Sequence, residues 1–380
     1  MQLQSSHFSK GRWSAPLPSH YDSAATLVLA FAAPEFADHP APLAELAAVF
    51  PNSVIAGCST SGEITGSQVQ DASISVAVAR FEHSLLRYAS TPIALPGDSF
   101  AAGERLAEQL AGPDLRAVFV LSDGLGVNGT PLVDALTRQL GAGVLITGGL
   151  AGDGSRFKRT WVLHQGQPKG QTICAVGFYG QRVNVGHGCD SGWSNFGPER
   201  RITHAEGNVL FELDGKPALA LYKSYLGERA AGLPGTALLF PLAVKREGAD
   251  QDTLVRTILA IDESRQSLTF AGDVPQGGVA RLMRASTDKL IGSAGVAGAQ
   301  ARSTSRLSVG PTLAVSVSCV GRRLVLGERT DEEVETVHDS LQAESTHVGF
   351  YSYGEISPAV PGGISELHNQ TMTVTVISES

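Results

Sequence analysis

The stretch Gly57-Cys58-Ser59-Thr60-Ser61-Gly62-Glu63-Ile64 returns near the other end of the chain as Gly349-Phe350-Tyr351-Ser352-Tyr353-Gly354-Glu355-Ile356. Each copy follows a short apolar run and precedes an alternating run, at 73–78 in the first and 371–376 in the second. Self-similarity of this kind predicts two related halves whose equivalent loops face one another. Because clefts form where domains meet, we expect a ligand site shared by the two loops.

Composition bounds the class of protein. A chain of 380 residues is long enough for two domains, and 42% hydrophobic with 17% charged residues is typical of a soluble globular protein. The net charge of −8 argues against non-specific binding of nucleic acid, which needs a basic face. The four cysteines lack the spacing of metal ligands and are too few for a disulfide scaffold.

The N-terminal segment 1–15 is polar and lacks the apolar core of a signal peptide. No apolar run reaches the ~20 residues that a membrane-spanning helix needs. These features predict a cytoplasmic protein without a membrane segment.

Apolar runs of strand length alternate with helical patterns in the first 150 residues. Strands are expected at 26–31, 117–121 and 144–147, and helices at 42–50, 98–111 and 131–140. This alternation indicates an α/β layer with a largely parallel sheet.

Short β-runs separated by glycine turns follow Gly148, at 160–163, 172–178 and 182–186, and they suggest a meander. Further strands are expected at 254–261, 268–270 and 313–318, and helices at 217–226, in part of 279–300 and from Thr330. Thr330 and Glu333 have the spacing of a capping box. The predicted fold is α/β: two related, closely packed modules, 21–200 and 201–380, with mixed sheets and a central β-meander.

The repeated loops hold the first candidate ligand-binding residues. In the first copy, Ser59, Thr60 and Glu63 either form a ligand cradle or satisfy the backbone of a strand-to-strand turn. The second copy favours a pocket, because Tyr351 and Tyr353 place aromatic groups at matching positions, with Glu355 behind them.

Two other strand ends are rich in glycine. The stretch 147–154 contains Gly149 and Asp153, and it either lets a ligand approach the backbone or makes a tight crossover. The stretch 122–129 matches G-x-G-x-x-G, but Pro131 and the lack of a following acid favour Asp123 as a cap or turn residue.

Polar residues concentrate just before the last strand, where His368, Asn369 and Gln370 follow Glu366. They either complete a specific pocket or tie down the loop 358–365. His187 lies between glycines and is either a metal or haem ligand or an exposed strand-end histidine. No Gly-x-Ser-x-Gly elbow or His-Glu-x-x-His motif is present, so we predict a protein that is not an enzyme. An enzyme that uses the cleft is the alternative.

Taken together, these motifs resemble the FIST family of sensory proteins. The N-terminal module resembles 57–64 and 148–153, and the C-terminal module resembles 349–356 and 366–373. The resemblance implies an intracellular sensor of a small ligand, with amino acids among the proposed ligands. No kinase segment accompanies the two modules, so the resemblance implies signalling through a partner such as a histidine kinase.

Some members of this kind are similar to haem-containing nitric-oxide sensors of the NosP type. That resemblance implies haem as a cofactor, with a diatomic gas as the ligand in a two-component system. His368 is then the first candidate for the metal ligand and His187 the second, and Arg322 or Arg323 would hold the propionates. An amino-acid sensor without haem is the alternative.

Overall fold

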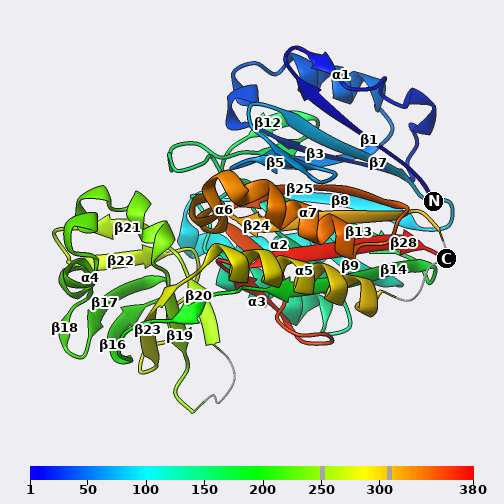
Figure 1. Cartoon of the computed structure of the whole chain (residues 1–380). Helices are drawn as coiled ribbons and strands as arrows, with labels where there is room; N and C mark the ends of the chain where they lie inside the picture. Colours follow the sequence, from blue (N-terminus) through cyan, green and yellow to red (C-terminus); the bar gives the residue numbers. More distant parts are fainter. Residues whose placement is uncertain (249–252, 306–309) are drawn as a thin grey trace.

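The computed structural model describes residues 1–248, 253–305 and 310–380 (Figure 1). Its helices are α1 (Ala41–Val49), α2 (Ser99–Leu110), α3 (Gly129–Leu140), α4 (Ala218–Leu226), α5 (Thr287–Thr304), α6 (Val320–Leu326) and α7 (Thr330–Ser340). The 3-10 helices are η1 (Ser19–Tyr21), η2 (Pro34–Ala37), η3 (Pro96–Asp98), η4 (Gly227–Gly232), η5 (Gly235–Leu239) and η6 (Gly327–Arg329).

Four sheets hold the strands. The first has the order β12 (Gln167–Lys169), β11 (Val162–His164), β4 (Val54–Ser59), β3 (Thr26–Ala32), β7 (Ile74–Arg80), β1 (Gln2–Ser9) and β2 (Arg12–Trp13). The second has the order β27 (Ser365–His368), β26 (Gly354–Pro358), β10 (Leu145–Leu150), β9 (Leu115–Ser122), β13 (Thr172–Tyr179) and β8 (Leu85–Pro92). The third has the order β6 (Gln68–Gln70), β5 (Glu63–Thr65), β25 (Ser345–Ser352), β24 (Thr312–Cys319), β28 (Met372–Glu379) and β14 (Val183–Asp190).

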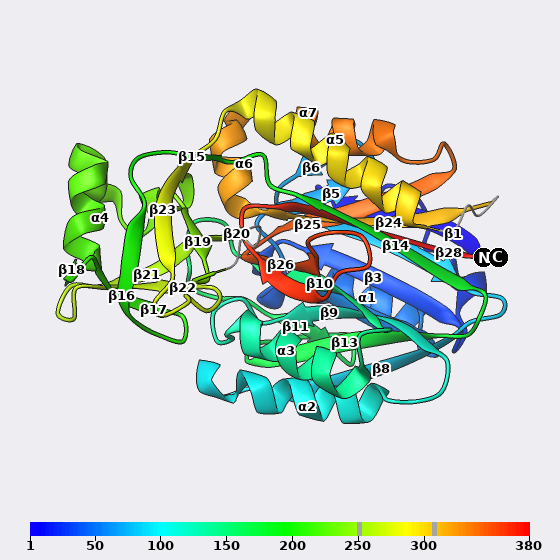
Figure 2. The same ribbon diagram turned by 90° about the horizontal axis from the view of Figure 1, so that it is seen from below.

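The fourth sheet belongs to a smaller lobe that includes α4 and lies to one side in both views (Figures 1 and 2). Its order is β20 (Thr253–Arg256), β19 (Leu242–Lys245), β23 (Val279–Arg284), β16 (Arg200–Glu206), β17 (Val209–Leu213), β22 (Ser267–Phe270) and β21 (Ile258–Asp262), with β15 (Ser194–Asn195) on β23 and β18 (Lys216–Pro217) on β17. The lobe has its own apolar core, in which Tyr222 of α4 packs with Phe270.

The first three sheets share one plan. Each contains a parallel pair (β3–β4, β9–β10 or β24–β25), an antiparallel strand beside it (β7, β13 or β28) and then another strand (β1, β8 or β14). On the other side of the pair lies a hairpin that comes from a different sheet: β5–β6 follows β4 but joins the third sheet, β11–β12 follows β10 but joins the first, and β26–β27 follows β25 but joins the second. This cyclic exchange interlocks three related units.

A glycine marks the same place in each unit. A Cβ atom on Gly57 would lie 2.0 Å from the carbonyl oxygen of Ala30, and one on Gly349 would lie 2.1 Å from that of Ser316. Gly148 is the third case, with Val120 oxygen 1.9 Å away. The repeat is therefore threefold, where the sequence predicted two related halves. The missing copy is the glycine-rich strand end 147–154.

The three sheets pack against one shared core (Figure 2). It includes Phe31 of the first sheet, Phe119 of the second and Val317 of the third, all at most 2% exposed. Phe31 stacks on Phe350 at a ring-centroid distance of 4.7 Å. Burial of these side chains supplies the driving force that holds the units together.

Most predicted elements are confirmed, and the fold is mixed α/β with mixed sheets. The predicted meander after Gly148 is wrong, because β11, β13 and β14 enter three different sheets. Strand-like runs separated by glycine turns resemble a meander in sequence, although each here pairs with strands far away in the chain. The predicted capping box of α7 is also wrong, since the Glu333 side chain bonds to Arg322 rather than to the helix N-terminus.

The predicted division between residues 200 and 201 falls at the start of β16. Within the described residues, no helix is both long and apolar enough to span a membrane.

Candidate functional site

A pocket of about 530 Å³ lies where the loop after β4, the loop after β10 and helices α6 and α7 meet, and we call it the α6 pocket. It is lined by Ser61, Val69, Gly154, Ser155, Val320, Arg323, Leu324, Gly327, Glu328, Thr330 and Asp331. Its volume falls within the range of ~300–1,000 Å³ that is typical of small-molecule sites. Segments that are about 260 residues apart in sequence therefore form one concave surface.

Arg323 is the main cationic group of this pocket. Its guanidinium donates to the carbonyl oxygen of Ser61 at 2.6 Å and forms two bonds to the carboxylate of Asp71, at 2.8 and 2.7 Å. It also lies over the ring of Tyr351, 5.6 Å from the centroid. The Asp71 side chain is 71% exposed, so the ion pair is one that solvent and competing carboxylates can reach.

Acidic groups lie on the other side of the α6 pocket, at the start of α7. Asp331 accepts a hydrogen bond from the Val69 amide at 2.9 Å. Glu328 forms no hydrogen bond or ion pair with any residue that the structure describes. The pocket thus presents one guanidinium and two carboxylates, which suits a ligand that carries both charges.

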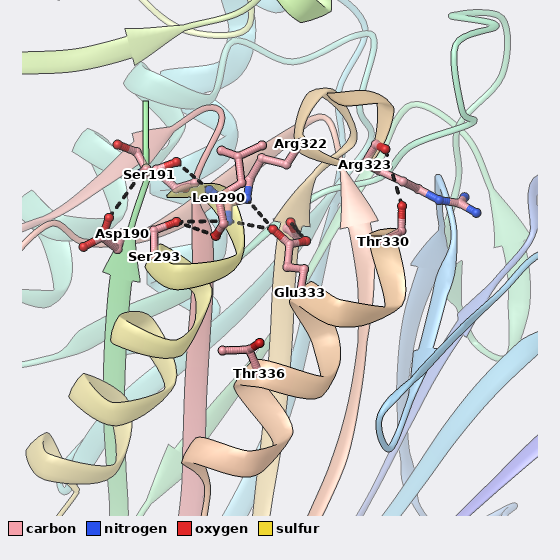
Figure 3. A network of polar contacts seen from close by, with 12 residues as sticks. Asp190, Ser191, Leu290, Ser293, Arg322, Arg323, Thr330, Glu333 and Thr336 are labelled. Carbon is pink, nitrogen blue, oxygen red and sulfur yellow. Dashed lines mark hydrogen bonds and ion pairs between the residues drawn. The ribbon is translucent and has the colours of Figure 1, made fainter. Parts of the chain in front are cut away.

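A fully buried ion pair connects α6 to α7 (Figure 3). Arg322 donates from Nε to Glu333 at 2.8 Å, and its Nη2 lies 2.6 Å from the same carboxylate. The guanidinium also donates to the carbonyl oxygens of Ser191 and Leu290, at 2.5 and 2.8 Å. Since both charged side chains are completely buried, these bonds replace the lost hydration.

Glu333 connects this ion pair to the central sheet. Its second oxygen accepts from the Tyr351 hydroxyl at 2.7 Å and from Ser318 at 3.1 Å. Tyr351 in turn lies under the Arg323 guanidinium. The network therefore ties α6 and α7, which both contribute residues to the α6 pocket, to strand β25.

The two repeated glutamates occupy matching sites inside the protein. Glu63 accepts from Thr60 and from the amide and hydroxyl of Ser73, at 3.1 and 2.7 Å. Glu355 accepts from Ser352 at 2.6 Å and from the amide and hydroxyl of Thr371, at 3.1 and 2.9 Å. The equivalent position in the third unit is Val162, which is why the sequence showed only two copies.

Burial raises the pKa of both carboxyl groups, to about 7 for Glu63 and about 8 for Glu355, although the hydroxyl and amide donors oppose the shift. In the unfolded chain both ionise near pH 4.3. Above that pH the folded state binds more protons than the unfolded state, so the free energy of unfolding falls as pH rises, until it passes the folded pKa values.

We expect wild-type protein to lose stability between pH 6.5 and 8.5, and Glu355→Gln to lose about 2 kcal/mol less over the same interval. Urea unfolding at several pH values measures both. The comparison at equal pH cancels the contributions of the histidines. An equal loss in the two proteins would show that Glu355 is ionised in the folded state at pH 6.5.

Asp153 and Tyr353 are bonded to each other close to the loop that lines part of the α6 pocket. The Tyr353 hydroxyl donates to Asp153, and Asp153 also accepts from the amides of Phe157, Lys158 and Arg159 at 2.8–2.9 Å. The Tyr353 ring stacks on Phe157 and is 1% exposed. Asp153 thus orders the loop that contributes Gly154 and Ser155 to the α6 pocket.

Ser59 and Gly149 are buried in strands close to these loops. Ser59 accepts from the Trp161 amide at 3.1 Å, and a Cβ on Gly149 would lie 2.7 Å from Val317. None of the predicted ligand-binding residues lines the α6 pocket itself.

His368, Asn369 and Gln370 lie elsewhere, at the junction with the smaller lobe. Asn369 accepts from the Thr257 amide at 3.3 Å and donates to the Tyr353 carbonyl at 3.2 Å. Gln370 donates to the carbonyl of Leu238 in η5 at 2.8 Å. All three residues are at most 5% exposed, and Asn369 and Gln370 fasten the lobe to the main body.

Three of the four residues predicted to hold haem are already bonded to protein groups. His368 Nε2 lies 2.8 Å from the Ser357 carbonyl oxygen, and burial lowers the pKa of this histidine to about 4. Arg322 is committed to Glu333, and Arg323 to Asp71. His187, the fourth of these residues, lines a separate cavity together with Thr137. Among the described residues, no group of three or more His, Cys, Asp or Glu side chains could hold a metal ion.

The sequence reasoning missed Ser61, Asp71, Glu328 and Asp331. Ser61 stands inside the repeated octapeptide. The two acids follow the Arg322–Arg323 pair within one helical connection, and this alternation of charge was the available signal. Asp71 had no signal of its own, since only the tertiary structure places it beside Arg323.

Comparison with known protein families finds two matching domains in this chain. The FIST N domain matches residues 26–216 and the FIST C domain matches residues 218–358. The chain belongs to the FIST family. FIST domains are small-ligand sensor domains, and the α6 pocket of this FIST protein takes residues from both matched segments.

Individual relatives of this FIST protein are distant. The uncharacterized protein MJ1623 of Methanocaldococcus jannaschii is 32% identical over 97 residues, which are 26% of this chain and 18% of that protein. The chain therefore matches about a fifth of the length of this curated relative. A crystal structure of cyanuric acid hydrolase from A. caulinodans aligns over 93% of this chain and 89% of that one, with 9% identity and a TM-score of 0.34.

Proposed function

We propose that the protein is a sensor that binds a free amino acid in the α6 pocket and signals to a partner protein such as a histidine kinase. The observation that carries the proposal is the Arg323–Asp71 pair at the rim of a pocket that also contains Glu328 and Asp331. The α-carboxylate of the ligand would displace Asp71 from Arg323, and the α-ammonium would face the two acids.

Exchange of one carboxylate for another gives the sensor its signal. Without ligand, Arg323 ties the loop around Asp71 to α6. With ligand, Asp71 is released while Arg323 keeps its bond to Ser61. Release of an exposed ion pair costs little free energy, so a ligand of modest affinity can shift the population.

The test is calorimetric titration of the purified protein with each of the twenty amino acids. We expect at least one to bind, Arg323→Gln to weaken its binding at least about tenfold, and Asp71→Asn to tighten it, because the internal competitor is gone. Arg200→Gln is the control, since Arg200 also forms an arginine–aspartate ion pair, with Asp214 in the smaller lobe, and it should bind like wild type.

Binding that is unchanged in Arg323→Gln, or binding by no amino acid, would contradict the proposal. Haem remains the other candidate for a sensor of this kind, and a Soret band in protein purified with haem supplied would favour it. Conversion of the bound amino acid, followed by NMR, would instead favour an enzyme.

A further inference from the structure

The threefold repeat places two cavities in equivalent positions. The first measures about 350 Å³ and lies between the end of α1, the start of β4, the turn of hairpin β11–β12 and Tyr88 of β8. The second measures about 240 Å³ and lies between the end of α3, the start of β10, the turn that connects β26 to β27 and His187 of β14. The two cavities therefore have the same four kinds of wall, contributed in each case by two neighbouring units.

Tyr88 and His187 are equivalent residues. In the second sheet, the residue that pairs with Ser122 lies on β13. Val176, three residues further along β13, pairs with Tyr88. In the third sheet, the residue that pairs with Ser318 lies on β28. Thr375, three residues further along β28, pairs with His187. The two cavities can thus be compared position by position.

The two cavities differ in whether their polar side chains have hydrogen-bond partners. In the first, the Tyr88 hydroxyl donates to the Leu163 carbonyl at 2.9 Å. In the second, Nε2 of His187 and Oγ1 of Thr137 are both buried without a hydrogen-bond partner, and His187 is only 6% exposed. Two unpaired polar groups in one cavity are costly unless something else pairs with them.

The chemistry of the His187 ring is defined by its surroundings. Burial lowers the pKa of His187, against the effect of a hydrogen bond to the Val360 backbone. Because Nε2 has no partner, that bond falls to Nδ1, and the neutral ring presents a lone pair at Nε2. A ligand group that donates a hydrogen bond to Nε2 would therefore satisfy the ring.

A third cavity, of about 340 Å³, continues from the His187 cavity. The two share Gly143, Leu145, Val185 and Thr304 in their walls, so they form one groove. The far end of the groove holds Arg116, an exposed guanidinium that forms no ion pair with any described residue. A bound anion would pair with this guanidinium.

We propose that this groove is a second ligand site, for a small carboxylate that also carries a hydroxyl or amide N–H group. The carboxylate pairs with Arg116, and the donor at the other end bonds to Nε2 of His187 beside Thr137. None of the residues that line this groove lines the α6 pocket, so the two sites are independent.

The test uses ¹⁵N-histidine-labelled protein and four probes: L-malate and L-lactate, which carry a hydroxyl, and succinate and propionate, which do not. The side-chain signals of His187 are assigned by their loss in His187→Gln. We expect malate or lactate to move the Nε2 signal upfield, and the matched acid without the hydroxyl to bind at least about fivefold more weakly.

Arg116→Gln should weaken malate or lactate binding at least about tenfold, because it removes a charge-assisted contact. Arg12→Gln, an exposed arginine on β2, is the control and should leave binding unchanged, as should Arg323→Gln. The proposal fails if no probe moves the His187 signal, if the acids with and without a hydroxyl bind equally, or if Arg116→Gln binds like wild type. A crystal structure with malate present that shows only ordered water between Thr137 and His187 would also overturn it.

Discussion

Replacement of Glu333 by alanine is expected to destabilise the protein by about 3–5 kcal/mol, the usual cost of leaving one partner of a buried ion pair uncompensated. Arg322 would keep its charge in a fully buried position, with the carbonyl oxygens of Ser191 and Leu290 and the hydroxyl of Ser293 as its remaining partners. The hydroxyls of Ser318 and Tyr351 would also lose their acceptor.

Equilibrium unfolding in urea measures this loss, and Glu332→Ala is the matched control. Glu332 is the neighbouring acid on α7, but it pairs with Arg329 on the exposed face. Its removal should leave the free energy of unfolding nearly unchanged, because an exposed ion pair contributes little. A similar small change in Glu333→Ala would mean that water reaches the Arg322 side chain. Since the network ties together α6 and α7, which both contribute residues to the α6 pocket, the same variant should also weaken ligand binding there.

Replacement of Gly349 by alanine is expected to cost about 3 kcal/mol or more, at the upper end of overpacking effects. The added methyl would lie 2.1 Å from the carbonyl oxygen of Ser316, inside a parallel strand pair that cannot move apart without opening the shared core. Gly57 and Gly148 hold the same place in the other two units and should respond similarly.

Thermal unfolding of the three variants tests both the cost and the repeat. Gly292→Ala is the control, because Gly292 lies within helix α5 with nothing within 4 Å of an added Cβ. That change should stabilise the protein by about 0.5–1 kcal/mol, since alanine is the better helix former. If Gly148→Ala were tolerated while the other two variants unfolded, Gly148 would not share the structural role that the threefold repeat assigns to it.

The smaller lobe meets the main body beside the α6 pocket. Gln370 links Leu238 in η5 to the segment before β28, and a Cβ on Gly321 of α6 would lie 2.3 Å from the Gln370 side chain. A displacement of α6 would therefore reach the smaller lobe through this contact.

The sequence by itself determined the local elements. Helical spacing in 98–111 and 131–140 and continuous apolar runs at 26–31 and 117–121 correspond to α2, α3, β3 and β9. These patterns depend on neighbours within a few residues, so the chain shows them directly. The repeated octapeptide likewise identified two of the three loops and the residues, from Thr60 to Glu355, that build the region around the α6 pocket.

Only the tertiary structure decided the pairing of strands and the purpose of the polar groups. Each unit gives one hairpin to the next sheet, and such long-range pairing leaves no periodic signal in the sequence. The third copy was hidden because Val162 replaces the glutamate. Glu333, predicted as a helix cap, and His368 to Gln370, predicted as pocket residues, find their partners more than ten residues away or in another lobe. The role of a polar side chain depends on its hydrogen-bond partner, and tertiary contacts between distant segments determine that partner.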